Sequence, residues 1–161
     1  MSTAVWPCEE RVVALVVSCL EHEWWEIASI AHTESRAHGA DIRTVKNAEL
    51  LIIEAKGFPG TVYARGVNQG KPKPTKPGFQ ARHWFSQVLF DCILRQSEYP
   101  DGQIVMALPN FPVYRSLVAR TSNAICKLGI GVYFVEEGGM VETLRAPQVI
   151  ATASIPPGDE P

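Results

Sequence analysis

The spacing of apolar residues changes along the chain between the period of a helix and the period of a strand. Helical spacing covers three stretches: 7–22, 79–96 and 113–128. Short apolar or alternating runs predict the strands 23–33, 42–45, 50–53, 103–108, 130–135 and 140–144. The order α-β-β-β-α-β-α-β-β predicts an α/β layered domain, in which helices flank a central mixed β-sheet.

The third predicted strand ends in charged residues. Leu50 to Ile53 is wholly apolar and β-prone, as expected of a strand that is buried on both faces, and Glu54-Ala55-Lys56 follows it directly. Residues two apart in a strand share a face, so Glu54 and Lys56 are expected on the same side. A carboxylate and an ammonium at the end of a core strand are costly to bury without partners.

A second carboxylate is expected opposite the first. If Asn47 and Ala48 form a two-residue hairpin loop, Lys46 faces Glu49, and the same register sets Asp41 opposite Glu54. Directly opposed Cβ atoms lie about 4.5–5.5 Å apart. Two carboxylates at that distance repel unless a cation lies between them. Oxygen ligands of this kind suit Mg²⁺, which also keeps waters that substrate phosphates can replace.

These residues resemble a known family. Asp41, followed by Glu54-x-Lys56 at the end of a hydrophobic strand, is similar to the PD-(D/E)XK superfamily of restriction-endonuclease-like nucleases. The departure is Ala40, where the family has proline, a position that only shapes the backbone. The resemblance implies the restriction-endonuclease-like fold, and the predicted order of elements matches it over residues 8–145. The alternative interpretation is a structural cluster of salt bridges, in which Lys56 pairs with Asp41 or Glu54.

The resemblance also implies roles for individual residues. Asp41, Glu54 and the Ala55 carbonyl would bind Mg²⁺ or Mn²⁺, and Lys56 would orient or help deprotonate the attacking water. The family often has a glutamine on the helix after the motif, for which Gln80 and Gln87 are both candidates. It also often has a glutamate on the first helix. Glu10 is the better positional candidate for that glutamate, and Glu9 is its rival.

A long basic stretch follows the motif. No Asp or Glu occurs between residues 57 and 90, and the prolines of 70–78 predict an extended loop. Basic residues there could neutralise a phosphate backbone without reading bases. The alternative is a solubilising linker. The predicted nucleic-acid-binding residues, which include one arginine before the motif, are Arg36, Arg65, Lys71, Lys73, Lys76, Arg82 and His83.

The overall composition is informative about the number of domains and the type of protein. The chain has 161 residues, 46% of them hydrophobic and 20% charged, with a net charge of −2. These values predict one globular domain, assigned to residues 1–146, and a flexible C-terminal tail over 147–161. The four cysteines form no CxxC pair, which argues against structural zinc and for a cytoplasmic protein with reduced thiols. The apolar run at 12–20 is too short to span a membrane.

These observations together predict a Mg²⁺-dependent deoxyribonuclease with DNA as its partner. The resemblance adds homodimerisation as an expectation, although the sequence shows no interface. One alternative is a catalytically silent nucleic-acid-binding or assembly subunit that retains the fold. A second is an α/β protein acting on another phosphate-bearing ligand, but residues 57–60 lack the spacing of a phosphate-binding glycine loop. Sequence specificity, endo- or exonuclease action, and DNA or RNA as substrate stay open.

Overall fold

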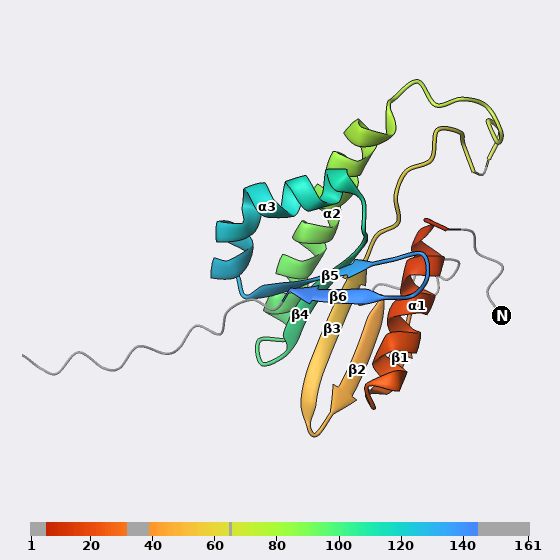
Figure 1. Ribbon diagram of the computed structural model, residues 1–161. Coiled ribbons are helices and arrows are strands. Elements are labelled where there is room, and N and C mark those ends of the chain that lie inside the picture. Colours follow the sequence, from red (N-terminus) through yellow and green to blue (C-terminus); the bar gives the residue numbers. More distant parts are fainter. Residues whose placement is uncertain (1–5, 32–38, 65, 145–161) are drawn as a thin grey trace, which may run out of the picture.

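The computed structural model describes residues 6–31, 39–64 and 66–144 (Figure 1). The predicted tail therefore lies outside the described residues. The elements occur in the predicted order α-β-β-β-α-β-α-β-β, which confirms the α/β layered class. They are α1 (Glu9–His22), β1 (Glu26–Ile30), β2 (Ile42–Lys46), β3 (Glu49–Ala55), α2 (Pro77–Glu98), β4 (Gln103–Pro109), α3 (Pro112–Lys127), β5 (Ile130–Val135) and β6 (Val141–Leu144).

One predicted boundary was wrong by several residues. The strand expected over 23–33 begins only at Glu26, because residues 23–25 form the turn that ends α1. Trp24 has a positive φ of 66° and is 87% exposed, so it does not supply an apolar strand position. A left-handed residue of this kind reverses the chain direction, which a pattern of apolar residues does not reveal.

The strands form one mixed sheet in the order β1-β2-β3-β4-β5-β6. The strands β1, β2 and β3 pair antiparallel, β3, β4 and β5 pair parallel, and β6 returns antiparallel to β5. Parallel neighbours need a crossover, which α2 supplies between β3 and β4 and α3 supplies between β4 and β5.

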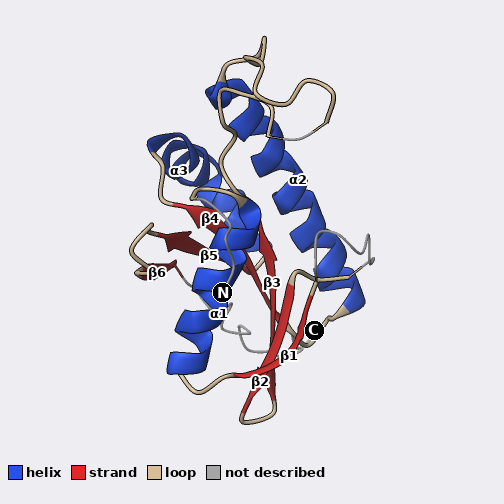
Figure 2. Cartoon of the chain, turned by 90° about the vertical axis from the view of Figure 1, so that its right-hand side faces the viewer, coloured by secondary structure: helices blue, strands red, loops and turns tan. Residues whose placement is uncertain are grey.

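Helices cover both faces of this sheet. Figure 2 shows α1 on one side of the strands and α2 on the other. Two separate apolar clusters result, one with residues of α1 and one with residues of α2 and α3. Successive side chains of β3 point to opposite faces of the sheet and so contribute to both clusters. Ile52 belongs to the α2–α3 cluster and Ile53 to the α1 cluster. The apolar run of β3 is therefore buried on both faces, as predicted.

The hairpin between β2 and β3 has the predicted register. Ile42 pairs with Ile53, and Lys46 pairs with Glu49. The two loop residues, Asn47 and Ala48, both have positive φ, at 50° and 65°. Positive φ at both central residues is the mark of a type I′ turn, whose twist matches that of the flanking strands.

The chain just beyond β3 packs against the start of α1. The buried Tyr114 hydroxyl of α3 donates to the Gly57 carbonyl at 2.7 Å, and the Phe58 N–H donates to the Pro7 carbonyl at 2.9 Å. A Cβ atom on Gly57 would lie 2.6 Å from both the Glu9 backbone nitrogen and the Pro7 carbonyl oxygen. Glycine at position 57 therefore allows the first turn of α1 to reach the end of β3.

Replacing Gly57 by alanine tests this close approach. We expect Gly57→Ala to lower the free energy of unfolding by about 1–3 kcal/mol, because backbone atoms must move to admit the methyl group. Gly78→Ala is the matched control, since a Cβ there meets nothing within 4 Å and alanine favours the helix. Urea denaturation measures both. Equal stability of the Gly57 variant and the wild type would contradict the packing.

Candidate functional site

Asp41 and Glu54 lie near the same end of the β2–β3 hairpin. The printed pairing ends with Ile42 and Ile53, and Asp41 lies in the bend just before β2. Asp41 is half-buried, and its Oδ2 accepts a 2.7 Å hydrogen bond from the Ala55 N–H. The Asp41 side chain therefore contacts the end of β3 at Ala55, the residue after Glu54, and its position directly opposite Glu54 stays a prediction.

Glu54 is buried and paired with an arginine from α2. It is 5% exposed, and its Oε1 accepts a 2.5 Å hydrogen bond from Nε of Arg95. Burial raises the pKa of Glu54 to about 7, the Arg95 hydrogen bond opposes that shift, and the charges of Asp41 and Asp91 add to it. The carboxylate thus lies where negative charge is costly, and Arg95 offsets only part of that cost.

Lys56 pairs with Glu9, at the start of α1. Its Nζ lies 3.2 Å from Oε2 of Glu9, and both side chains are half-buried. Burial lowers the pKa of Lys56, but the charges of Glu9, Asp41 and Asp91 outweigh burial, so its pKa is raised. A protonated lysine orients a water or neutralises a phosphate and does not accept a proton. Of the two predicted roles of Lys56, a protonated ammonium is compatible with orienting a water, and the role itself stays a prediction.

Three details of the prediction need correction here. Glu54 and Lys56 were expected on one side of the sheet, but Glu54 pairs with Arg95 of α2 and Lys56 pairs with Glu9 of α1, which lie on opposite sides of the strands. The structure brings Glu9, not Glu10, to Lys56, because Glu9 is the residue whose backbone packs on Gly57. Lys56 pairs with neither Asp41 nor Glu54, so the salt-bridge cluster of the alternative interpretation has different partners: Glu9 for Lys56 and Arg95 for Glu54.

Gln80, one of the two predicted glutamines, lies at the start of α2. The Gln80 side chain bonds to Nζ of Lys73 and to the Thr75 carbonyl, within the loop before the helix. Gln80 is fifteen positions before Arg95, which corresponds to about 22 Å along a helix axis. The structure therefore does not bring Gln80 to Glu54 or Lys56. Gln87 is exposed, and its role stays a prediction.

The loop over residues 57–76 begins directly after Lys56 and extends beyond the sheet to the start of α2 (Figure 1). A bridge between Val62 and Pro72 joins its two arms, together with backbone hydrogen bonds such as that from the Tyr63 N–H to the Lys71 carbonyl. Lys71, Lys76, Arg82 and His83 are exposed, whereas Lys73 is half-buried, with its Nζ 5.9 Å from the centre of the Tyr63 ring. Arg36 and Arg65 lie outside the described residues.

The side chains near the end of β3 include oxygen ligands that suit a hard cation, but they are too few to coordinate a metal without water. Asp41 and Glu54 offer carboxylate oxygens near the end of β3, and Mg²⁺ is commonly bound by one or two carboxylates plus waters and substrate phosphates. Within residues 6–31, 39–64 and 66–144, no cluster of three or more His, Cys, Asp or Glu side chains is placed to hold a metal. The arrangement therefore suits Mg²⁺ or Mn²⁺ with retained waters, and not a metal that needs four protein ligands.

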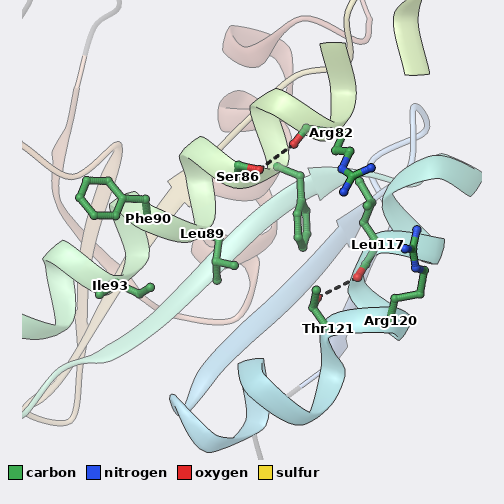
Figure 3. Close-up of a pocket in the computed structure, with 9 residues that line it drawn as sticks. Arg82, Ser86, Leu89, Phe90, Ile93, Leu117, Arg120 and Thr121 are labelled. Atoms are coloured by element: carbon green, nitrogen blue, oxygen red, sulfur yellow. Dashed lines mark hydrogen bonds between the residues drawn. The ribbon is translucent and has the colours of Figure 1, made fainter. Parts of the chain in front are cut away.

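A hollow of about 380 Å³ lies between α2 and α3 (Figure 3). Its wall combines apolar side chains, including Leu89, Phe90 and Leu117, with the guanidinium groups of Arg82 and Arg120. None of Asp41, Glu54 and Lys56 lines it. The hollow is therefore separate from the carboxylate site.

Sequence reasoning missed Arg95 and Asp91. Arg95 follows Val88 and Cys92 at helical spacing, and both of these are buried, so an arginine on the sheet-facing side of α2 could have been predicted. Asp91 is half-buried one turn before Arg95, and its charge acts on both Glu54 and Lys56. For both residues, the feature in the sequence that could have revealed them is a charged side chain on or next to the apolar face of a predicted helix.

Comparisons with known proteins give one structural likeness. The fold is similar to that of an XisH family protein from Nostoc punctiforme, with 13% sequence identity and a TM-score of 0.49, over 82% of this chain and 96% of that chain. A likeness of this degree says nothing about activity. No protein-family model matches the sequence, and no curated protein matches it either. Among the described residues, no helix has the length and apolar character needed to cross a membrane.

The raised pKa of Glu54 predicts a pH-dependent stability. Because the pKa rises from 4.5 to about 7 on folding, the folded protein binds this proton more tightly. The stabilisation is complete below pH 4.5 and is lost as the pH rises to about 7, an effect of about 3 kcal/mol. We expect Glu54→Gln to remove this component. Urea denaturation in EDTA between pH 4.5 and 8 measures it.

The control is Glu49→Gln, at the exposed start of β3. Its stability should change with pH in parallel with the wild type. If the wild type and Glu54→Gln also gave parallel curves, Glu54 would not be the titrating group.

Proposed function

We propose that this protein is a Mg²⁺-dependent deoxyribonuclease of the restriction-endonuclease-like class. The observation that supports the proposal is the hydrogen bond from the Ala55 N–H to Asp41 Oδ2, which holds one carboxylate at the end of a core strand, between the buried Glu54 and Lys56 in the chain. The α/β order and the mixed sheet agree with the architecture that this class requires.

Asp41 and Glu54 would hold the cation, together with the Ala55 carbonyl. A bound divalent ion would supply Lewis-acid stabilisation of the charge that develops on phosphorus and on the leaving oxygen. Lys56, kept protonated by its carboxylate neighbours, would hold the attacking water or a phosphate oxygen by donating hydrogen bonds. Glu9 would hold Lys56 in position from the other side.

The burial of Glu54 favours this proposal over a purely structural cluster. A pKa of about 7 means that Arg95 alone does not fully compensate the buried charge. A divalent cation beside Glu54 and Asp41 would stabilise the charged form of both carboxylates.

The loop over residues 57–76 would hold the DNA backbone. It leaves the strand directly after Lys56, and its exposed lysines carry charge without neighbouring acids. Contacts of this type provide affinity by releasing counterions and provide no sequence specificity.

Single substitutions test the catalytic assignment. We expect Asp41→Ala, Glu54→Ala and Lys56→Ala each to abolish Mg²⁺-dependent cleavage, because each removes either a cation ligand or the donor to the water. The assay incubates purified protein with supercoiled, linear and branched DNA in Mg²⁺, Mn²⁺ or EDTA. Circular dichroism checks that each variant is folded, and Glu49→Ala is the control on the same strand. Cleavage by a folded Glu54→Ala protein would refute the mechanism.

The main rival is a nucleic-acid-binding or assembly subunit without turnover. In that case DNA binding would persist in EDTA, and calorimetry of the wild type would show no uptake of Mg²⁺ or Mn²⁺. Metal uptake that is lost in Asp41→Ala would favour the nuclease.

Charge removal tests the DNA-binding loop. We expect the double variant Lys71→Gln/Lys76→Gln to bind DNA more weakly, with the slope of log K against log salt reduced by about 1–2, because each lost phosphate contact removes about 0.9. Fluorescence anisotropy at several salt concentrations measures the slope. Arg120→Gln/Lys127→Gln, on α3, removes the same charge and should leave the slope unchanged. An equal loss in both variants would mean that only net charge matters.

A further inference from the structure

Arg95 connects the carboxylate site to α2. We propose that Arg95 is a positioning residue for the cation site: it holds the Glu54 carboxylate in the orientation that binds metal, although it does not touch the metal itself. This inference rests on the proposed function and adds to it a residue outside the family-like motif.

The two carboxylates are anchored in different ways. Asp41 is held by the backbone, through the Ala55 N–H at 2.7 Å. Glu54 is held by a side chain, through Nε of Arg95 at 2.5 Å. The strand register fixes the Glu54 backbone, but its side-chain torsions still allow several positions of the carboxylate. Among the described residues, the hydrogen bond that selects one of them comes from Arg95.

Arg95 is itself held at both ends of its guanidinium group. Nε donates to Glu54, and NH1 donates to Glu98, one turn further along α2. A planar guanidinium with two carboxylate partners has little rotational freedom, which makes it a more rigid anchor than a lysine ammonium. The Arg95 side chain is 15% exposed, so solvent screens the contact with Glu54 only weakly.

The packing of α2 sets the position of Arg95. Val88 and Cys92 are buried in the cluster shared with β3 and β4, and Arg95 follows them on the same helical face. The helix therefore delivers a cation to the buried end of the strand. This links the geometry of the site to helix packing as well as to the hairpin.

A guanidinium near a cation site could also oppose metal binding. Two features argue for support. Arg95 shares its charge between Glu54 and Glu98, and the negative charge of Asp91 also acts on Glu54. The region around Glu54 therefore keeps an excess of negative charge while Arg95 is in place.

Calorimetric titration with Mn²⁺ tests the inference without relying on activity. We expect Arg95→Met to bind Mn²⁺ about 10–100-fold more weakly than the wild type, the usual effect of losing a residue that orients a metal ligand. Arg95→Lys should recover part of the affinity, because lysine keeps the positive charge but lacks the planar guanidinium group that donates to two carboxylates. Arg120→Met, on α3, removes a guanidinium outside the site and should bind as the wild type does.

A cleavage assay adds a second readout. High Mn²⁺ should restore cleavage by Arg95→Met but not by Glu54→Gln, because the first keeps the ligand and the second loses it. Thermal unfolding shows whether each variant is folded. If Arg95→Met does not fold, Arg95→Lys decides: weaker Mn²⁺ binding by a folded protein supports the inference, and wild-type affinity overturns it.

The possible failures are distinct. Wild-type affinity or tighter binding in folded Arg95→Met overturns the positioning role while the metal site stands. Absence of Mn²⁺ binding by the wild type refutes the proposed function, and this inference with it.

Discussion

The buried negative charge of Glu54 is the constraint that organises the site. A carboxylate at the end of a core strand must be compensated, and the fold compensates it from α2 through Arg95. The charge of Asp41 acts in the opposite direction, because it raises the pKa of Glu54 further. Compensation of Glu54 by Arg95 is therefore incomplete, and the cation that we propose would complete it.

Elements from both faces of the sheet meet at the end of β3. Gly57 lets the first turn of α1 approach, which brings Glu9 to Lys56. From the opposite face, α2 brings Arg95 to Glu54, and α3 holds the following segment through Tyr114. Groups far apart in the sequence thus converge on residues 54–57, at the end of β3 and just beyond it.

Much of this arrangement could be predicted from the sequence, because it depends on local patterns. The order of elements follows from apolar periodicity, and the register of the β2–β3 hairpin from Lys46 and Glu49 to Ile42 and Ile53 follows from a two-residue turn. Partners across layers could not be predicted in the same way. Choosing Glu9 over Glu10 requires the contact of α1 with Gly57, and pairing Arg95 with Glu54 requires the depth at which α2 crosses β3. Gln80 shows the same limit, since its helical spacing was suitable but its position along α2 was not.

The central claim is that Asp41 and Glu54 share one divalent cation. Anomalous diffraction from crystals soaked in Mn²⁺ tests it most directly. The account predicts a single strong anomalous peak between the two carboxylates, with water completing its coordination. A fully occupied Mn²⁺ elsewhere, or no peak while Arg95 stays on Glu54, would contradict it.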